Sequence, residues 1–200
     1  MVFSLCAALT AALAVFASTS STVAAAKIEP IYVDGALGSN FESWSWGISY
    51  LDFEDPCPGK QLPNRCLCAE VIPYGALSFK TTKPFPAHGQ LHLHIHTNAP
   101  GLQLQLESSS EINYSISETV DITPSRNHNT KGHFFTKKID LSTFQTTAPR
   151  FDRIVLGNCL ENDASCMRGK GQETKICIES MFLDTTTSEN TSHHTHKFGN

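Results

Sequence analysis

The sequence has few charged residues and lacks the motifs of most enzymes. Asp, Glu, Lys and Arg make up 17% of its 200 residues, the net charge is −4, and no basic cluster occurs. Binding to nucleic acid or to an anionic membrane depends on clustered cations, so neither is an expected partner. A Gly-X-Ser-X-Gly elbow, a phosphate-binding loop and a His-Glu-X-X-His element are all missing. We therefore assign no catalytic residue, and neutral ligands are the easier partners.

No apolar run is long enough to cross a membrane, which takes about 20 residues in a helix. The longest runs from Leu5 to Ala17 and is interrupted by Thr10, within a segment that has no charged side chain before Lys27. Small residues end this segment at Ala26, which is typical of a secretory signal peptide, although a basic residue near Met1 is missing. We expect residues 1–26 to be removed and the mature protein to be secreted and extracellular.

Cysteine is scarce, and its spacing is informative. Outside the signal segment, which contains Cys6, the chain has Cys57, Cys66, Cys68, Cys159, Cys166 and Cys177. An even number in an exported chain predicts about three disulfides. We expect Cys159 to pair with Cys166 and close a polar loop. Cys57 is expected to pair with either Cys66 or Cys68, and the other of these two with Cys177.

The mature chain shows no convincing amphipathic helix. Short apolar or alternating segments, separated by Gly, Pro and Asn, predict about eight or nine strands. They lie at residues 28–33, 43–50, 76–81, 90–97, 102–107, 112–117, 133–139, 151–157 and 174–183. This pattern predicts one all-β domain over residues 27–184, built as an antiparallel sandwich or barrel. Residues 185–200, rich in Ser, Thr and His, are expected to form a disordered tail.

Both tryptophans lie in one expected strand, residues 43–50. Alternation would place Trp44, Trp46, Ile48 and Tyr50 on one face. That face could be part of the core, as the Trp46–Ile48 pair suggests, or a platform on which sugar rings stack. Trp44 is the better ligand candidate because it follows the loop of residues 38–40. The candidate carbohydrate-binding residues are Asn40, Glu42, Trp44, Trp46 and Tyr50. Tyr74 could add a further stacking ring, and hydrogen bonds could come from Gln103, Gln105 and Arg153.

Histidine alternates with aliphatic residues between Leu91 and His96. The aliphatic side chains suit a core, and His92, His94 and His96 would then share the outer face. Alternate histidines on a strand can bind a transition metal, which allows a metal-dependent enzyme as an alternative. The other interpretation is a polar surface that uses histidine. Asn113 and Asn190 begin N-glycosylation sequons, which predicts a glycoprotein.

The order of these elements resembles secreted β-sandwiches of the galactose-binding-like and carbohydrate-binding-module type. The segments that carry the resemblance are residues 32–37, 44–46, 75–79, 139–142, 151–156 and 176–183. It implies a jelly-roll-like β-sandwich, here stabilised by disulfides. Many such modules hold a structural calcium between their first and last strands, which would use Asp34 and Glu179 in this chain. No other cofactor is implied.

The sequence therefore predicts a secreted, non-catalytic carbohydrate-binding protein that recognises cell-wall or surface polysaccharide. One alternative is the metal-dependent enzyme that uses His92, His94 and His96. The other is a disulfide-stabilised extracellular structural or protein-interaction module. The sequence indicates neither the particular glycan nor an oligomeric state.

Overall fold

A computed structural model describes residues 28–60, 64–99, 101–110, 113–122, 133–144, 148–158 and 173–185. The predicted signal peptide, the tail beyond residue 185, Cys159, Cys166 and Asn190 lie outside these ranges. Within them the chain forms strands throughout, and the one helical element is the 3-10 turn η1 (Leu141–Thr143). The predicted all-β class is confirmed.

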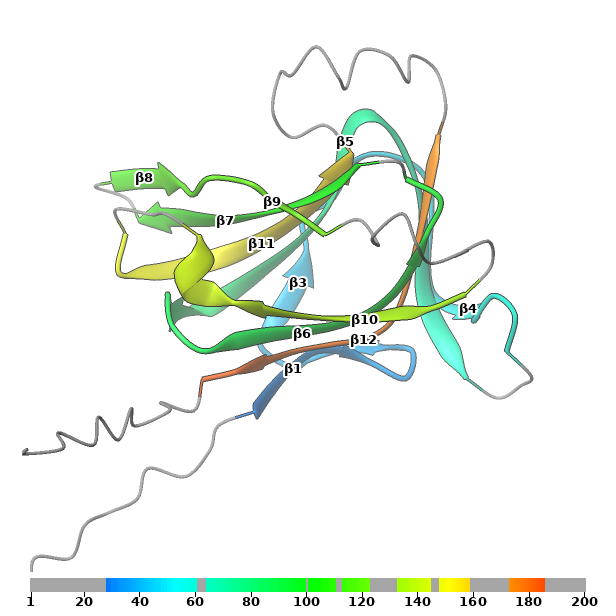
Figure 1. The fold of residues 1–200 in the computed structure, drawn as a ribbon, viewed down its shortest axis with the longest axis horizontal. Coiled ribbons are helices and arrows are strands. Elements are labelled where there is room, and N and C mark those ends of the chain that lie inside the picture. The colour runs from blue at the N-terminus through cyan, green and yellow to red at the C-terminus, as the bar shows by residue number, and fades with distance from the viewer. Residues whose placement is uncertain are drawn as a thin grey trace, which may run out of the picture.

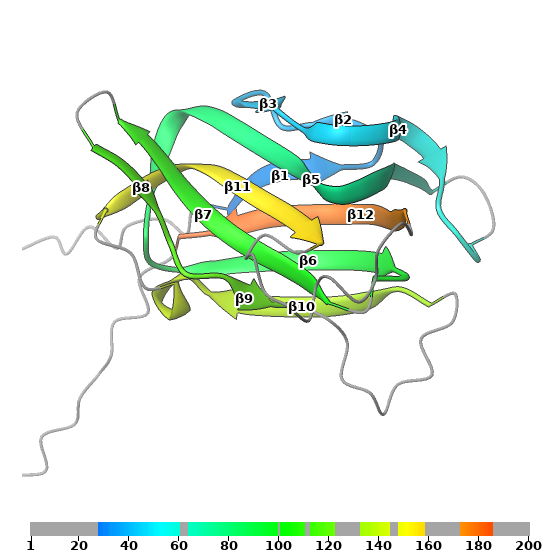
Figure 2. The ribbon, with the colours of Figure 1, turned by 90° about the horizontal axis from the view of Figure 1, so that it is seen from above.

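The strands pair antiparallel in the order β10-β6-β12-β5-β11-β7-β8, with β1 on β12, β2 on β1, β3 and β4 on β5, and β9 on β7 (Figures 1 and 2). Their bounds are β1 (Ile28–Val33), β2 (Ala36–Leu37), β3 (Phe41–Ser43), β4 (Trp46–Pro56), β5 (Arg65–Pro86), β6 (Gln90–Thr97), β7 (Leu102–Ser110), β8 (Asn113–Ile116), β9 (Val120–Asp121), β10 (Phe135–Asp140), β11 (Arg150–Asn158) and β12 (Thr174–Asp184).

Strand β5 belongs to both layers of the fold. Its first part, up to Val71, pairs with β12 and β4, whereas its second part, from Ala76, pairs with β11 and β3. Between these parts the backbone changes direction at Tyr74, which has a φ of 66°. The long strand therefore carries the sheet around a corner, and the two layers face each other across one core (Figure 2).

Alternating aliphatic residues fill that core from both layers. Leu91, Leu93 and Ile95 point inward from β6, and Leu102, Leu104 and Leu106 point inward from β7. All six are at most 2% exposed, as the sequence alternation predicts. Phe79, Phe85 and Phe151 add large side chains from β5 and β11. Burial of this apolar surface is the main source of stability.

Two register irregularities change which side chains face outward. Gly47 has a φ of +60°, and the register of β4 shifts beside it. As a result Ile48 packs against the core while Trp46 is 42% exposed, so they do not share a face as predicted. In β12 the register shifts between Ile178 and Ser180. This bulge buries Met181, which simple alternation places on the face opposite Ile178.

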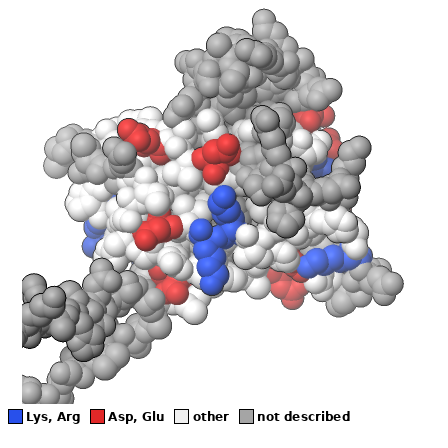
Figure 3. Space-filling model, viewed as in Figure 1, with Lys and Arg blue, Asp and Glu red and all other residues white. Residues whose placement is uncertain are grey.

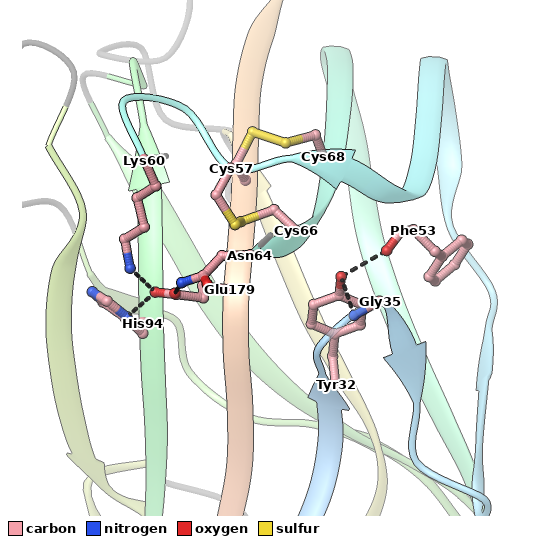
Figure 4. The surroundings of a disulfide bond; sticks show 11 residues. Tyr32, Gly35, Phe53, Cys57, Lys60, Asn64, Cys66, Cys68, His94 and Glu179 are labelled. Carbon is pink, nitrogen blue, oxygen red and sulfur yellow. Dashed lines mark hydrogen bonds and ion pairs between the residues drawn. A yellow bond between two sulfur atoms is a disulfide. The ribbon is translucent and has the colours of Figure 1, made fainter. Parts of the chain in front are cut away.

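The disulfides lie outside the main core. Cys57 is bonded to Cys66, and Cys68 to Cys177. This agrees with the expected use of the four cysteines and fixes the choice that the sequence left open. The four form a second buried cluster on the outer side of β5 and β12, and Phe134 packs against it. Figure 4 shows the disulfides. We call this outer side, which also carries His92, His94, His96 and Glu179, the disulfide face.

Tyr32 ties the first strand to the β4–β5 hairpin. Its hydroxyl donates to the Phe53 carbonyl at 2.7 Å and accepts from the Gly35 amide at 3.1 Å (Figure 4). The side chain is fully buried. Burial, opposed by the Gly35 hydrogen bond, raises the pKa of Tyr32 to about 12. The phenol therefore stays neutral, and its hydroxyl can donate the hydrogen bond to the Phe53 carbonyl.

On the face shown in Figure 3, Lys and Arg side chains are interspersed with Asp and Glu side chains. Among the described residues, no helix is both long and apolar enough to traverse a bilayer.

Candidate functional site

The outer side of the second layer carries both tryptophans, and we call it the tryptophan face. It is formed by β3, the second part of β5, β11, β7 and β8. Ladder pairing places four charged side chains in one row across these strands: Glu42 opposite Lys80, Lys80 opposite Arg153, and Arg153 opposite Glu107. Because directly opposed residues share a face, all four lie on the same side of the sheet.

Trp44 and Trp46 stand on this face beside the charged row. The Trp44 amide donates to the Ser78 carbonyl, and Trp46 pairs with Ala76, so both continue along β5 from Lys80. Trp44 is 48% exposed and Trp46 is 42% exposed. Large aromatic side chains are usually well buried, so two adjacent exposed tryptophans are unusual. The structure excludes the core interpretation for this pair.

Hydrogen bonds fix both indole rings. Trp44 Nε1 donates to Glu42 Oε1 at 2.7 Å, and Trp46 Nε1 donates to the Tyr74 carbonyl at 3.0 Å. The Lys80 Nζ lies 3.9 Å from the centroid of a Trp44 ring, and the Arg153 guanidinium carbon lies 5.2 Å from it. These cation–π contacts hold Trp44 over β5 and toward β11. The rings are thus preorganised before any ligand arrives.

The residues of β5 and β11 that lie in line with the two tryptophans across the sheet have smaller side chains. Ser78 and Val155 follow Trp44, and Ala76 and Gly157 follow Trp46. Beyond them on β7 lie Gln105 and Gln103. The face therefore has the two tryptophan rings on one side and the amide groups of Gln103 and Gln105 on the other. The smaller side chains of β5 and β11 lie between them.

Two buried polar atoms of this region have no hydrogen-bond partner among the described residues: Ser78 Oγ and Arg153 Nε. Another nitrogen of the Arg153 guanidinium is paired: Nη1 donates to Glu107 Oε2 at 2.9 Å. An unpaired buried donor or acceptor costs about 1 to 3 kcal/mol.

Two of the predicted site residues have other neighbours. The Asn40 amide donates to Glu29 of β1. Tyr50 lies opposite Glu70 and its hydroxyl donates to Asp52 at 3.4 Å. Glu70 is two residues from Cys68 on β5, and Asp52 lies directly opposite Cys68, so both side chains are on the disulfide face. Tyr50, which lies opposite Glu70, is therefore on that face too. The structure brings together Glu42, Trp44 and Trp46.

The predicted metal-binding histidines do lie in one row on the disulfide face, but their rings contact other side chains. His92 packs near Phe182 with 5.7 Å between ring centroids, and His94 and His96 lie 5.2 and 5.7 Å from Phe134. The His94 Nδ1 lies 2.5 Å from Glu179 Oε2. Within the described ranges, no three His, Cys, Asp or Glu side chains are placed to share a metal.

Glu179, one of the two residues proposed for calcium, is surrounded by nitrogen atoms. Its carboxylate accepts from Lys60, and from Asn64 Nδ2 at 2.7 Å (Figure 4). Burial opposes ionisation, but the hydrogen bonds and charges of Lys60, Asn64 and His94 lower the pKa of Glu179 overall. The other residue, Asp34, occupies the turn after β1 with a φ of 49°. The calcium site stays a prediction.

Sequence reasoning missed Lys80 and Glu107 as members of the site. Neither belongs to a motif, and both become neighbours of the named candidates only through the pairing of β5, β11 and β7. The available signal was weak: Lys80 ends an apolar segment, and Glu107 follows the Leu102–Leu106 alternation.

No known family model matches this sequence, and no curated protein matches it. Solved structures do. A variant of a family 29 carbohydrate-binding module aligns at a TM-score of 0.54 with 19% identity, covering 80% of this chain and 86% of the other. Two further variants, complexed with mannohexaose and with cellulohexaose, each align at 0.53 with 20% identity over 80% of this chain and 92% of theirs.

This chain has the fold of a carbohydrate-binding module. The resemblance inferred from the sequence is therefore confirmed for architecture, including the antiparallel jelly-roll-like sandwich. A disulfide-bonded fold of this kind is typical of extracellular proteins. The structural alignments show a shared fold, but only about one aligned residue in five is identical. A shared fold does not identify the ligand, so the ligand must be inferred from the tryptophan face.

Proposed function

We propose that the protein is a secreted, non-catalytic carbohydrate-binding protein that recognises cell-wall or surface polysaccharide through its tryptophan face. The observation that carries this proposal is the pair of exposed, fixed indole rings at Trp44 and Trp46, set beside Glu42, Lys80 and Arg153. In this proposal the chain is exported after removal of residues 1–26.

The chemistry of the face fits a sugar chain. Indole rings offer flat apolar surface to the C–H side of a sugar ring, and nearby polar groups can bond its hydroxyls. The charges of this face largely compensate one another, because Glu42 lies opposite Lys80 and Arg153 bonds Glu107. A neutral ligand therefore meets no strong uncompensated charge. The related modules in complex with mannohexaose and cellulohexaose support the same ligand class.

The test is retention of the purified mature domain on insoluble cellulose, mannan, chitin and β-glucan. We expect the wild type to be retained on at least one polysaccharide, and Trp44→Ala and Trp46→Ala to be released from it. Losing one stacked ring should weaken binding about fivefold, since such contacts contribute on the order of 1 kcal/mol each.

Tyr50→Ala is the matched control, because it removes a ring that is 38% exposed but lies on the disulfide face. It should leave retention unchanged. Circular dichroism would establish that all variants are folded. The proposal is wrong if the wild type passes through every polysaccharide, or if both tryptophan variants are retained as well as the wild type.

A further inference from the structure

A third exposed aromatic ring lies on the opposite border of the tryptophan face. Tyr114 belongs to β8 and is 61% exposed. Ile116, two residues further on, lies directly opposite Glu107 of β7. Residues two apart on a strand share a face, and β8 pairs with β7 without a register shift, so Tyr114 points to the same side as Glu107.

A series of neighbouring side chains connects Tyr114 to Trp44. Tyr114 lies on the same side of the sheet as Glu107. Glu107 pairs with Arg153 at 2.9 Å, and the Arg153 guanidinium carbon lies 5.2 Å from the Trp44 ring centroid. Desolvation and the negative charge of Glu107 raise the pKa of Tyr114, so its phenol stays protonated and can donate to the carboxylate. The ring is thus held in place although it is open to solvent.

The series crosses most of the sheet. It begins at the end of β3, passes over β5, β11 and β7, and ends on β8. Four inter-strand spacings, about 19 Å in total, separate the backbones of β3 and β8. The Trp44 ring reaches inward from β3 toward Lys80 and Arg153. A single sugar could contact one end only. An extended oligosaccharide could contact both, with the partly buried Arg153 and Glu107 beneath its middle.

We propose that Tyr114 is the far end of the glycan site, and that a polysaccharide chain lies across the strands between Trp44 and Tyr114. This inference rests on the proposed function, and it specifies the ligand as an extended chain segment. Arg153 and Glu107 act as positioning residues between the two aromatic ends.

Ligand length tests the inference. Affinities of wild type, Trp44→Ala and Tyr114→Ala are measured by calorimetry for mannohexaose and cellulohexaose, and for the corresponding disaccharides. We expect Tyr114→Ala to weaken hexasaccharide binding about fivefold to tenfold, as for loss of one stacking contact. It should leave disaccharide binding at the Trp44 end unchanged. Trp44→Ala should weaken binding of both lengths.

Tyr114→Phe separates the ring from its hydroxyl. It keeps the stacking surface and removes only the hydroxyl, so its loss of hexasaccharide affinity should be smaller than that of Tyr114→Ala. Both substitutions preserve the Asn113 sequon, because its middle position accepts any residue except proline. Glycosylation is therefore constant across the series, and near-ultraviolet circular dichroism checks the fold.

The outcomes distinguish the two proposals. If Trp44→Ala weakens hexasaccharide binding and Tyr114→Ala does not, the inference is overturned while the proposed function stands. Equal losses for both lengths in Tyr114→Ala would also overturn it, because the ring would then not define a distant end. If the wild type binds neither hexasaccharide and is retained on no polysaccharide, both proposals fail.

Discussion

Arg153 and Glu107 form an ion pair at the centre of the tryptophan face, with 2.9 Å between Nη1 and Oε2 and side chains only 17% and 8% exposed. Water screens this pair weakly, so each charge depends on the other. Its position between Trp44 and Tyr114 also makes it the link between the two aromatic borders of the face.

Glu107→Gln should lower the free energy of unfolding by about 2 to 3 kcal/mol, because Arg153 would keep a largely buried charge without its counterion. The measurement is urea unfolding followed by tryptophan fluorescence. The matched control is Glu54→Gln, which breaks the exposed pair with Arg65, whose side chains are 64% and 52% exposed. That change should have little effect. Equal losses in the two variants would contradict a special role for Glu107.

The stabilising contribution of the ionised Glu179 should be lost in acid. Its pKa is lowered from the ordinary 4.5 in the folded state, so its contribution is present above pH 4.5 and is lost as pH falls through the folded pKa. We expect Glu179→Gln to be less stable than wild type near pH 6. The difference should shrink as pH falls below 4.5 through the folded pKa, where the wild-type carboxylate becomes protonated. Unfolding curves across this range provide the check, and a difference independent of pH would refute the assignment.

The two disulfides should contribute unequally. Cys68–Cys177 spans 109 residues of sequence, whereas Cys57–Cys66 spans 9. Constraint of the unfolded chain alone predicts contributions of about 5 and about 2.6 kcal/mol respectively. We therefore expect the Cys68→Ala/Cys177→Ala double variant to unfold at lower urea concentration than Cys57→Ala/Cys66→Ala. The reverse order would show that packing of the cysteine cluster outweighs chain entropy.

Gly47→Ala should disturb the site as well as the fold. A Cβ at this position would lie 2.7 Å from the Gly75 Cα, and its φ of +60° disfavours any other residue. We expect a loss of about 1 to 3 kcal/mol and a shifted tryptophan emission maximum, because Trp46 is adjacent. Gly101→Ala is the control, since a Cβ there meets nothing within 4 Å. Similar losses in both variants would argue against the close approach at Gly47.

Strict alternation made parts of this fold predictable from sequence. The expected strands 28–33 and 90–97 coincide with β1 and β6, and Leu91, Leu93 and Ile95 face the core as alternation requires. Strand β5 was predicted only over residues 76–81. Pro73 and Gly75 favour a break in the local pattern, and the backbone does change direction at Tyr74, but pairing on both sides of this point makes Arg65–Pro86 one strand.

The site was only partly predictable, because it depends on register. Trp44 and Trp46 were recognised as candidates, yet the register shift beside Gly47 decided that Trp46 faces solvent and Ile48 the core. Lys80 and Glu107 lie 36 and 63 residues from Trp44 along the chain. Local sequence patterns carry no information about which residue of a distant strand lies opposite another.

The pairing of β1 with β12 has a consequence for how the domain forms. Ile28 lies opposite Asp184, and Cys68 bonds to Cys177, so the earliest described strand and the early cysteine both require the last strand as partner. A chain emerging from the ribosome must carry these partners unpaired until residues 174–184 are made. Sheets with such distant pairings fold slowly and expose strand edges meanwhile. Oxidation of Cys68 with Cys177 would thus mark completion of the sheet.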